Sequence, residues 1–165
     1  MKKLVLVFML TILVSAGAFA QRPDGWGLGL VGRSNFAWDG FGQSFWWGLS
    51  LKAPQAPIYW GINLSMRSGF FGASVVGDYY LLDQVIASEV NFGWFMGLGG
   101  NVGINVYGSD TSVFVGGRIP IGVYIMPVEF FEVFLNIAPT LGLHINPFEF
   151  PTGFLGFDFG LRFWF

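Results

Sequence analysis

Residues 155–165 alternate strictly between two kinds of side chain. The odd-numbered positions are all Leu or Phe, whereas the even-numbered positions are Gly156, Asp158, Gly160, Arg162 and Trp164. A period of two places successive side chains on opposite faces of a β-strand. One face of this strand is therefore wholly apolar and the other carries two charges. The pattern is typical of a strand with hydrocarbon on one side and a wetter environment on the other.

Seven further runs show the same alternation, at 26–33, 45–52, 58–67, 70–79, 91–106, 113–125 and 131–145. Each run nearly meets or exceeds the roughly 9–11 residues that a tilted strand needs to cross a bilayer. An even number of strands lets a barrel close with both chain ends on one side of the membrane. We therefore expect an all-β fold, an eight-stranded antiparallel up-and-down transmembrane β-barrel.

The N-terminal segment has the pattern of a cleavable secretory signal peptide. Lys2 and Lys3 precede an apolar stretch at 4–14, and Ala18 and Ala20 form a small-x-small cleavage site. We expect residues 1–20 to be removed after export, and residues 21–165 to form a barrel in the outer membrane. A retained anchor is the alternative, but the apolar stretch is short for a membrane span.

The composition agrees with lipid as the solvent of the outer surface. The chain is 53% hydrophobic and 11% charged, against roughly 25% charged residues in soluble domains. Without Lys2 and Lys3, 6 of the 8 basic residues remain against 10 acidic residues, so the mature charge is −4. This balance argues against nucleic acid as a partner. Because the chain has no cysteine, no disulfide can form.

Turn residues predict the connections between these strands. We expect periplasmic turns at 53–57, after Leu82 and at 126–128, and extracellular loops at 34–43, 68–69, 108–112 and 146–152. Pro120 and Pro139 lie inside expected strands, so each is predicted to mark a bulge or an early strand end. The boundary between Tyr79 and Glu89 stays open. A transmembrane helix over 90–109 is the competing interpretation, but its many glycines disfavour it.

Charged side chains fall on the inward face of the expected strands. They are Arg33, Lys52, Arg67, Asp78, Arg118, Glu132, Asp158 and Arg162. An unpaired charge in a narrow interior is costly, so we expect a salt-bridge network that pairs the arginines with Glu132, Asp158 and Asp78, including an Arg118–Glu132 pair. Inward glycines alternate with inward aromatic residues, a combination that fills a narrow barrel. An ion or proton pathway is the functional alternative to this plugged interior.

Other motifs give little support for chemistry. Residues 27–32 match G-x-G-x-x-G, but no helix is expected to follow, as a dinucleotide site requires. His144 is the only histidine, and a catalytic triad would also need a nearby serine and an acid. Glu149 and Thr152 are close in sequence, whereas Ser34 and Ser68 could approach only from other loops. Clusters of metal ligands are missing, so we expect no metal, no cofactor and no enzyme activity.

The expected loop at 34–43 is the longest on the outer side. It carries Phe36, Trp38 and Phe41 beside Asp39. Exposed aromatic residues of this kind favour contact with a partner or with lipid headgroups.

These residues resemble the small eight-stranded outer-membrane proteins of the OmpA transmembrane-domain and OmpX type. The terminal segment 161–165 is similar to the C-terminal signal read by the barrel-assembly machinery, with Phe163 and Phe165 on the outward face. Segments 117–122 and 134–143 also resemble an uncharacterised family of spirochaetal outer-membrane barrels. The resemblance implies that both prolines are family features, and it brings no catalytic residues.

The sequence thus predicts a non-enzymatic outer-membrane barrel with a structural or surface-interaction role. Its expected partners are outer-membrane lipid and the barrel-assembly machinery. A small ion-conducting channel and, less favoured, a lipid A-modifying enzyme that uses His144 remain as alternatives.

Overall fold

A computed structural model of the chain describes residues 22–37 and 43–165. The expected signal peptide at 1–20 and the loop residues Trp38, Asp39 and Phe41 lie outside the described residues. Within the described part of the chain, no helix is both long enough and apolar enough to cross a membrane.

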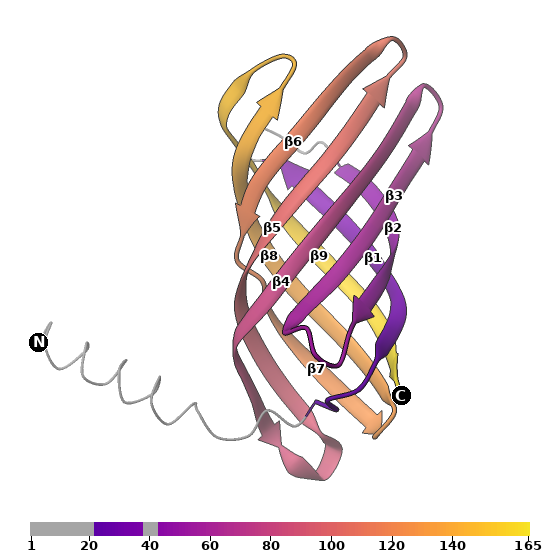
Figure 1. Cartoon of the computed structure of the whole chain (residues 1–165), viewed down its shortest axis with the longest axis vertical. Helices are drawn as coiled ribbons and strands as arrows, with labels where there is room; N and C mark the ends of the chain where they lie inside the picture. The colour runs from indigo at the N-terminus through magenta and orange to yellow at the C-terminus, as the bar shows by residue number, and fades with distance from the viewer. Residues whose placement is uncertain (1–21, 38–42) are drawn as a thin grey trace, which may run out of the picture.

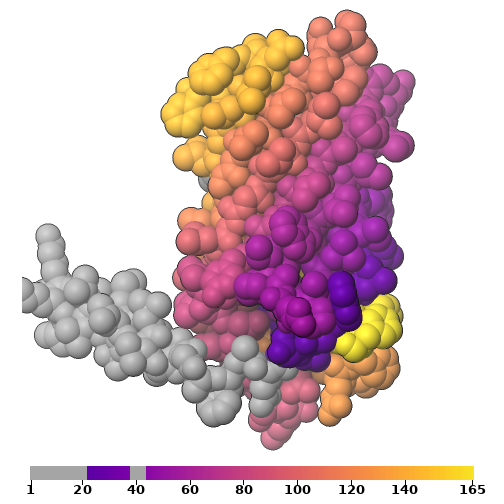
Figure 2. Space-filling view, viewed as in Figure 1, coloured from indigo at the N-terminus to yellow at the C-terminus, as the bar shows by residue number. Residues whose placement is uncertain are grey.

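The described residues form antiparallel strands that close into a ring (Figure 1). The strands are β1 Gly27–Ala37, β2 Gln43–Lys52, β3 Ile58–Arg67, β4 Phe70–Ala87, β5 Phe92–Tyr107, β6 Asp110–Arg118, β7 Ile121–Val128, β8 Phe131–Ile145 and β9 Glu149–Trp164. Strand β1 pairs with both β2 and β9, and the ring is completed where β4 pairs with β5. The space-filling view shows the indigo start of the described chain beside its yellow C-terminal end (Figure 2).

Strands β6 and β7 occupy one position in the ring, because both pair with β5 on one side and with β8 on the other. They are separated by Ile119 and Pro120, without a register shift against β5. The carbonyl of Pro120 accepts a hydrogen bond from the Gly97 N–H at 2.9 Å, but proline has no N–H to donate in return. The ring therefore contains eight strands, as predicted, and the expected strand end at Pro120 is confirmed.

The expected bulge or strand end at Pro139 is wrong. Pro139 lies inside β8, opposite Leu155 of β9, and the register is continuous around it. Its carbonyl accepts a hydrogen bond from the Ile119 N–H at 3.0 Å. Because proline has no N–H, only the hydrogen bond that this N–H would donate toward Ile119 is missing, and the strand continues through Pro139.

The strands extend further than the alternation predicts, and β4 does so most. The connection expected after Leu82 begins later, within the boundary left open between Tyr79 and Glu89: β4 runs to Ala87 and turns through a short 3-10 helix, η1 Ser88–Val90. The register against β5 shifts between Tyr80 and Leu82, which is the signature of a β-bulge. The loops predicted at 34–43, 108–112 and 146–152 are shorter in the structure, because residues 34–37, 43, 110–112 and 149–152 belong to strands. The turn expected at 126–128 is wrong: these residues end β7, where a register shift against β8 accommodates Pro127, and the chain turns at 129–130.

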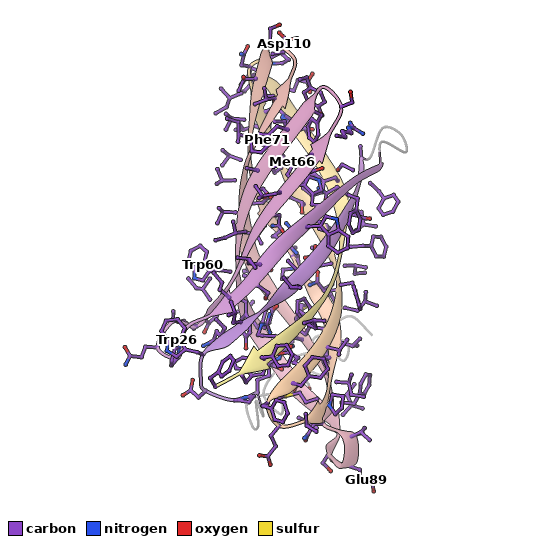
Figure 3. All side chains as sticks on the ribbon, turned by 90° about the vertical axis from the view of Figure 1, so that its right-hand side faces the viewer. Trp26, Trp60, Met66, Phe71, Glu89 and Asp110 are labelled. Carbon is purple, nitrogen blue, oxygen red and sulfur yellow. The ribbon has the colours of Figure 1, made fainter. Side chains whose placement is uncertain are left out.

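Apolar side chains cover the outer surface of the barrel. Trp26, Trp60, Met66 and Phe71 point away from the strands (Figure 3) and are 61%, 41%, 72% and 39% exposed. Inside, glycines face large rings on neighbouring strands. A Cβ atom added to Gly93 would lie 2.5 Å from the ring of Tyr124, its partner in β7. The glycine is thus required by the close approach of the ring.

Candidate functional site

The barrel interior contains two clusters of buried ion pairs, one in its middle and one toward the end where the chain termini lie. We define the middle cluster as Arg33, Asp78, Arg118 and Asp158. Asp158 accepts from Arg33 Nη2 at 2.9 Å and from Arg118 Nη2 at 2.6 Å. Arg118 Nε also lies 3.3 Å from Asp78 Oδ1. All four residues are buried, and two guanidinium groups balance two carboxylates.

We define the terminal-end cluster as Arg22, Asp83, Glu132 and Arg162, because it lies toward the chain ends. Glu132 is fully buried. Its Oε2 accepts from Arg162 Nη1 at 2.8 Å and from Trp164 Nε1 at 2.9 Å, while its Oε1 lies 3.0 Å from Arg22 Nη2. The formal charges of this cluster also sum to zero. Each buried charge in the two clusters therefore has an oppositely charged neighbour, which offsets its desolvation.

Arg22 and Asp83 were missed by the sequence analysis. Arg22 lies before the first strand, yet its side chain enters the barrel and its Nη1 donates to Asp83 Oδ2 at 2.9 Å. Strict alternation from Asp78 would place Asp83 outside. The bulge after Tyr80 changes the parity, so that Asp83 faces Phe95 on the inner side. Arg22 precedes the first expected strand, so the alternation of side chains could not indicate that it points into the barrel.

Aromatic rings pack around the terminal-end cluster. Tyr59 stacks on Tyr80 with 4.2 Å between ring centroids, and Tyr80 stacks on Phe95 with 4.4 Å. The guanidinium carbon of Arg22 lies 3.9 Å from the ring centroid of Tyr124 and 4.7 Å from that of Phe95. Such cation–π contacts add stabilisation where water is excluded.

Three expectations about the charge network need correction. Arg67 is exposed, and its guanidinium carbon lies 4.9 Å from the ring centroid of Phe70, outside both clusters. Lys52 is buried, but its Nζ donates to the backbone carbonyl of Ala53 at 2.7 Å and not to a carboxylate. Arg118 pairs with Asp158 and Asp78, so the expected Arg118–Glu132 pair is wrong: these two residues lie in different clusters because their strands are staggered.

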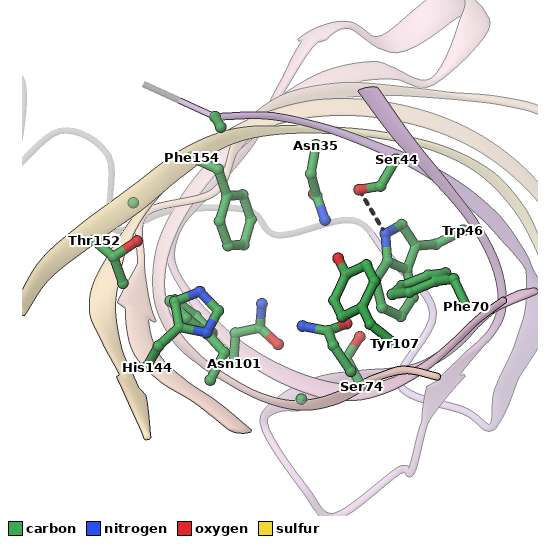
Figure 4. A pocket seen from close by; sticks show the side chains of 15 residues that line it. Asn35, Ser44, Trp46, Phe70, Ser74, Asn101, Tyr107, His144, Thr152 and Phe154 are labelled. Atoms are coloured by element: carbon green, nitrogen blue, oxygen red, sulfur yellow. Dashed lines mark hydrogen bonds between the residues drawn. The ribbon is translucent and has the colours of Figure 1, made fainter. Parts of the chain in front are cut away.

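A cavity of about 230 Å³ lies inside the barrel at the end opposite the termini (Figure 4). We call it the vestibule. Its walls combine aromatic rings with amide and hydroxyl groups, including Asn35, Trp46, Asn101, Tyr107 and Phe154. Among the described residues that line the vestibule, none is Asp, Glu, Lys or Arg. The vestibule is thus a neutral, amphipathic site above the ion-pair clusters.

His144 also borders the vestibule, where its Nδ1 lies 2.9 Å from Ser112 Oγ. This serine, which was not among the candidates expected from the sequence, lies on β6, the strand next to β8. Glu149 is opposite His144 in the β8–β9 register, but in the described part of the chain no carboxylate forms an ion pair with the imidazole. The arrangement is a serine–histidine pair without the acid that would orient a catalytic base.

Phe36 belongs to β1 and not to a loop, and its ring packs edge-on against Phe157 at 5.4 Å. At the other end, Phe163 and Phe165 are 42% and 80% exposed on the outer surface. The backbone N–H of Phe165 donates to the Trp26 carbonyl at 2.8 Å. Within the described residues, no cluster of aspartate, glutamate, histidine or cysteine side chains forms a possible metal-binding site.

No protein-family model and no curated protein matches this chain. Among solved structures, Neisserial surface protein A (NspA) is similar, with a TM-score of 0.55 and 9% identity over 87% of this chain and 98% of that one. The N-terminal β-barrel domain of Pseudomonas aeruginosa OprF has a TM-score of 0.46 and 12% identity over 83% of this chain and 97% of that one. At such identities the likeness to NspA establishes the fold. The predicted likeness to OmpA- and OmpX-type barrels is confirmed at that level, and the spirochaetal family stays a prediction.

Proposed function

We propose that this protein is a non-enzymatic β-barrel of the outer membrane, with a structural or surface-interaction role and an interior closed by its own side chains. The outward apolar surface fits a lipid environment. The two ion-pair clusters support closure, because they fill the interior below the vestibule. A small space of about 20 Å³ between them is lined by Arg33, Asp158 and Arg162 among others, which is room for about one water molecule.

The balanced charges carry the argument against a channel. An ion passing along the axis would have to separate carboxylate–guanidinium pairs that are almost completely removed from water. Breaking a buried pair costs about 3–5 kcal/mol, and each cluster contains several such contacts. We therefore expect the lumen to stay closed to ions at modest voltage.

Planar-bilayer recording tests this proposal. The purified protein, refolded in detergent and added to a bilayer, is expected to give no discrete current steps. A porin added afterwards to the same membrane is the control that the recording detects channels. Reproducible steps from the wild-type protein would contradict the closed interior and favour the channel alternative.

The orientation follows from the barrel rules. The start of the described chain at Arg22 and the C-terminal Phe165 lie at the same end of the barrel (Figure 1), and in bacterial barrels the chain ends lie on the periplasmic side. In our proposal the vestibule therefore faces the cell exterior. The exposed Phe163 and Phe165 are available to the barrel-assembly machinery as the protein inserts.

The lipid A-modifying alternative depends on Ser112 and His144. This pair lacks an acid that orients the imidazole in the described part of the chain, so we expect no catalysis. His144→Ala is predicted to leave the lipid A profile of the cell, measured by mass spectrometry, unchanged. A profile that changes with His144→Ala but not with Glu129→Gln, an exposed residue in the turn between β7 and β8, would favour the enzyme.

A further inference from the structure

The vestibule has an unpartnered polar group deep in its wall. Asn101 is 5% exposed, and its amide points into the cavity (Figure 4). The side-chain oxygen of Asn101 has no hydrogen-bond partner, and neither has that of Asn35 in the opposite wall. A buried amide without a partner is costly, and the terminal torsion of asparagine is soft. A ligand that offers hydroxyl donors inside the vestibule would satisfy these oxygens once the amides rotate to present them to the cavity.

The remaining walls are aromatic. Trp46, Phe70 and Tyr107 gather on one side of the cavity, and Phe154 lies on another (Figure 4). Trp46 is held in place because its Nε1 donates to Ser44 Oγ at 2.9 Å, and because its ring packs edge-on against Phe70 at 6.1 Å. Rings of this kind bind an apolar C–H face, whereas a purely aliphatic ligand would leave the amides without partners.

The described lining of the vestibule offers a charged ligand no permanent counter-charge, and its histidine, His144, is paired with Ser112. The described lining residues include no acid and no lysine or arginine, and the guanidinium groups of the middle cluster already have carboxylate partners. A phosphate, carboxylate or ammonium group would lose its hydration without gaining a counter-charge. The ligand must therefore be neutral, hydroxylated and partly apolar.

We propose that the vestibule binds one neutral hexose ring. Such a ring combines hydroxyl groups for the asparagines with C–H faces for the aromatic residues. The cavity of about 230 Å³ lies below the range of roughly 300–1,000 Å³ for drug-sized ligands, which fits a single ring. This inference rests on the proposed function, because it needs the vestibule to face outward. The ring can come from a free sugar or from the end of a surface polysaccharide.

The indole signal of Trp46 provides the test. We would titrate ¹⁵N-labelled protein in detergent micelles with D-glucose, and with dextran as the polymer of the same unit. Both are expected to shift the Trp46 indole resonance, assigned with Trp46→Phe, and to leave that of Trp164 in the terminal-end cluster unchanged. A shift with glucose alone identifies free sugar as the ligand. Neither probe moving Trp46, or glucuronate or glucosamine binding more tightly than glucose, would overturn the proposal.

Variants separate the site from a general effect on the barrel. Asn101→Ala is expected to weaken glucose binding about tenfold, the usual effect of losing one or two neutral hydrogen bonds. Asn63→Ala is the matched control, because Asn63 is also buried and unpartnered but does not line the vestibule. If Asn101→Ala does not fold, Asn105→Ala replaces it, because Asn105 also lines the vestibule and is only half-buried; weaker glucose binding is again expected. Equal affinity for glucose in the Asn101→Ala variant and the Asn63→Ala control would contradict the assignment of Asn101 to the sugar site.

The two proposals fail in different ways. A barrel that conducts ions but binds glucose would contradict only the closed interior. A barrel that is silent in bilayers and does not respond to either sugar would contradict only the vestibule site.

Discussion

Removing one charge from the terminal-end cluster should destabilise the barrel strongly. Glu132 is 0% exposed and accepts from Arg162 and Trp164 at 2.8 and 2.9 Å, while Arg22 lies at 3.0 Å. Glu132→Gln keeps the size of the side chain and one acceptor oxygen. It changes the formal charge of the cluster from zero to +1 and leaves two guanidinium groups to share the remaining carboxylate, Asp83.

The magnitude follows from the cost of breaking a buried pair. Removal of one partner costs about 3–5 kcal/mol, and the retained amide oxygen places Glu132→Gln near the lower value. We therefore expect a loss of about 3 kcal/mol in the free energy of unfolding. The matched control is Glu129→Gln, an exposed acid in the turn between β7 and β8, for which we expect a change within about 0.5 kcal/mol.

Urea titration in lipid vesicles measures this difference. The folded fraction is read from the heat-modifiable band on gels, with equilibrium approached from both the folded and the unfolded state. A midpoint for Glu132→Gln equal to that of Glu129→Gln would refute the view that the cluster is a dry, tightly coupled set of charges.

Two further predictions use the same assay. Arg22→Met should lower the free energy of unfolding by about 1–3 kcal/mol, because Asp83 and Glu132 lose charge-assisted contacts. The exposed Arg67→Met should have little effect. Equal effects of the two substitutions would mean that the Arg22 side chain does not lie in the lumen. Gly93→Ala should lower the free energy of unfolding by about 1–3 kcal/mol through overpacking, since its new methyl group would lie 2.5 Å from Tyr124. Gly100→Ala should be neutral, because no atom lies nearer than 3.9 Å to its new methyl group. A neutral Gly93→Ala would contradict the packing described for the interior.

The alternation of side chains was enough to predict the eight-stranded ring. Two strands, β3 and β8, have the predicted bounds, because their faces differ along their whole length. The extensions of β1, β6 and β9 were missed because their polar ends look like turns. Pairing at the ends of the strands depends on backbone hydrogen bonds, and these leave little trace in hydropathy.

The site was harder to predict than the fold. The alternation of side chains correctly placed Asp78, Arg118 and Asp158 inside the barrel. It does not determine the register between neighbouring strands, and this register decides which charged side chains contact each other. The inward position of Asp83 could not be predicted, because a bulge moves every later residue of the strand to the opposite face. Ser112 and His144 lie 32 residues apart, so their contact exists only through the pairing of β6 with β8.

The central claim is that outward side chains contact hydrocarbon, while inward side chains between the vestibule and the chain ends are sealed from both water and lipid. Because the chain has no cysteine, spin labels can be placed singly at the four consecutive positions 62–65 of β3 and their collision with oxygen and with a water-soluble nickel complex measured in vesicles. Ile62 and Leu64 are 42% and 44% exposed, whereas Asn63 and Ser65 are 0% and 8% exposed. The account predicts high oxygen accessibility at 62 and 64, and low accessibility to both reagents at 63 and 65. Equal values at all four positions, or nickel accessibility at 62 and 64, would contradict it.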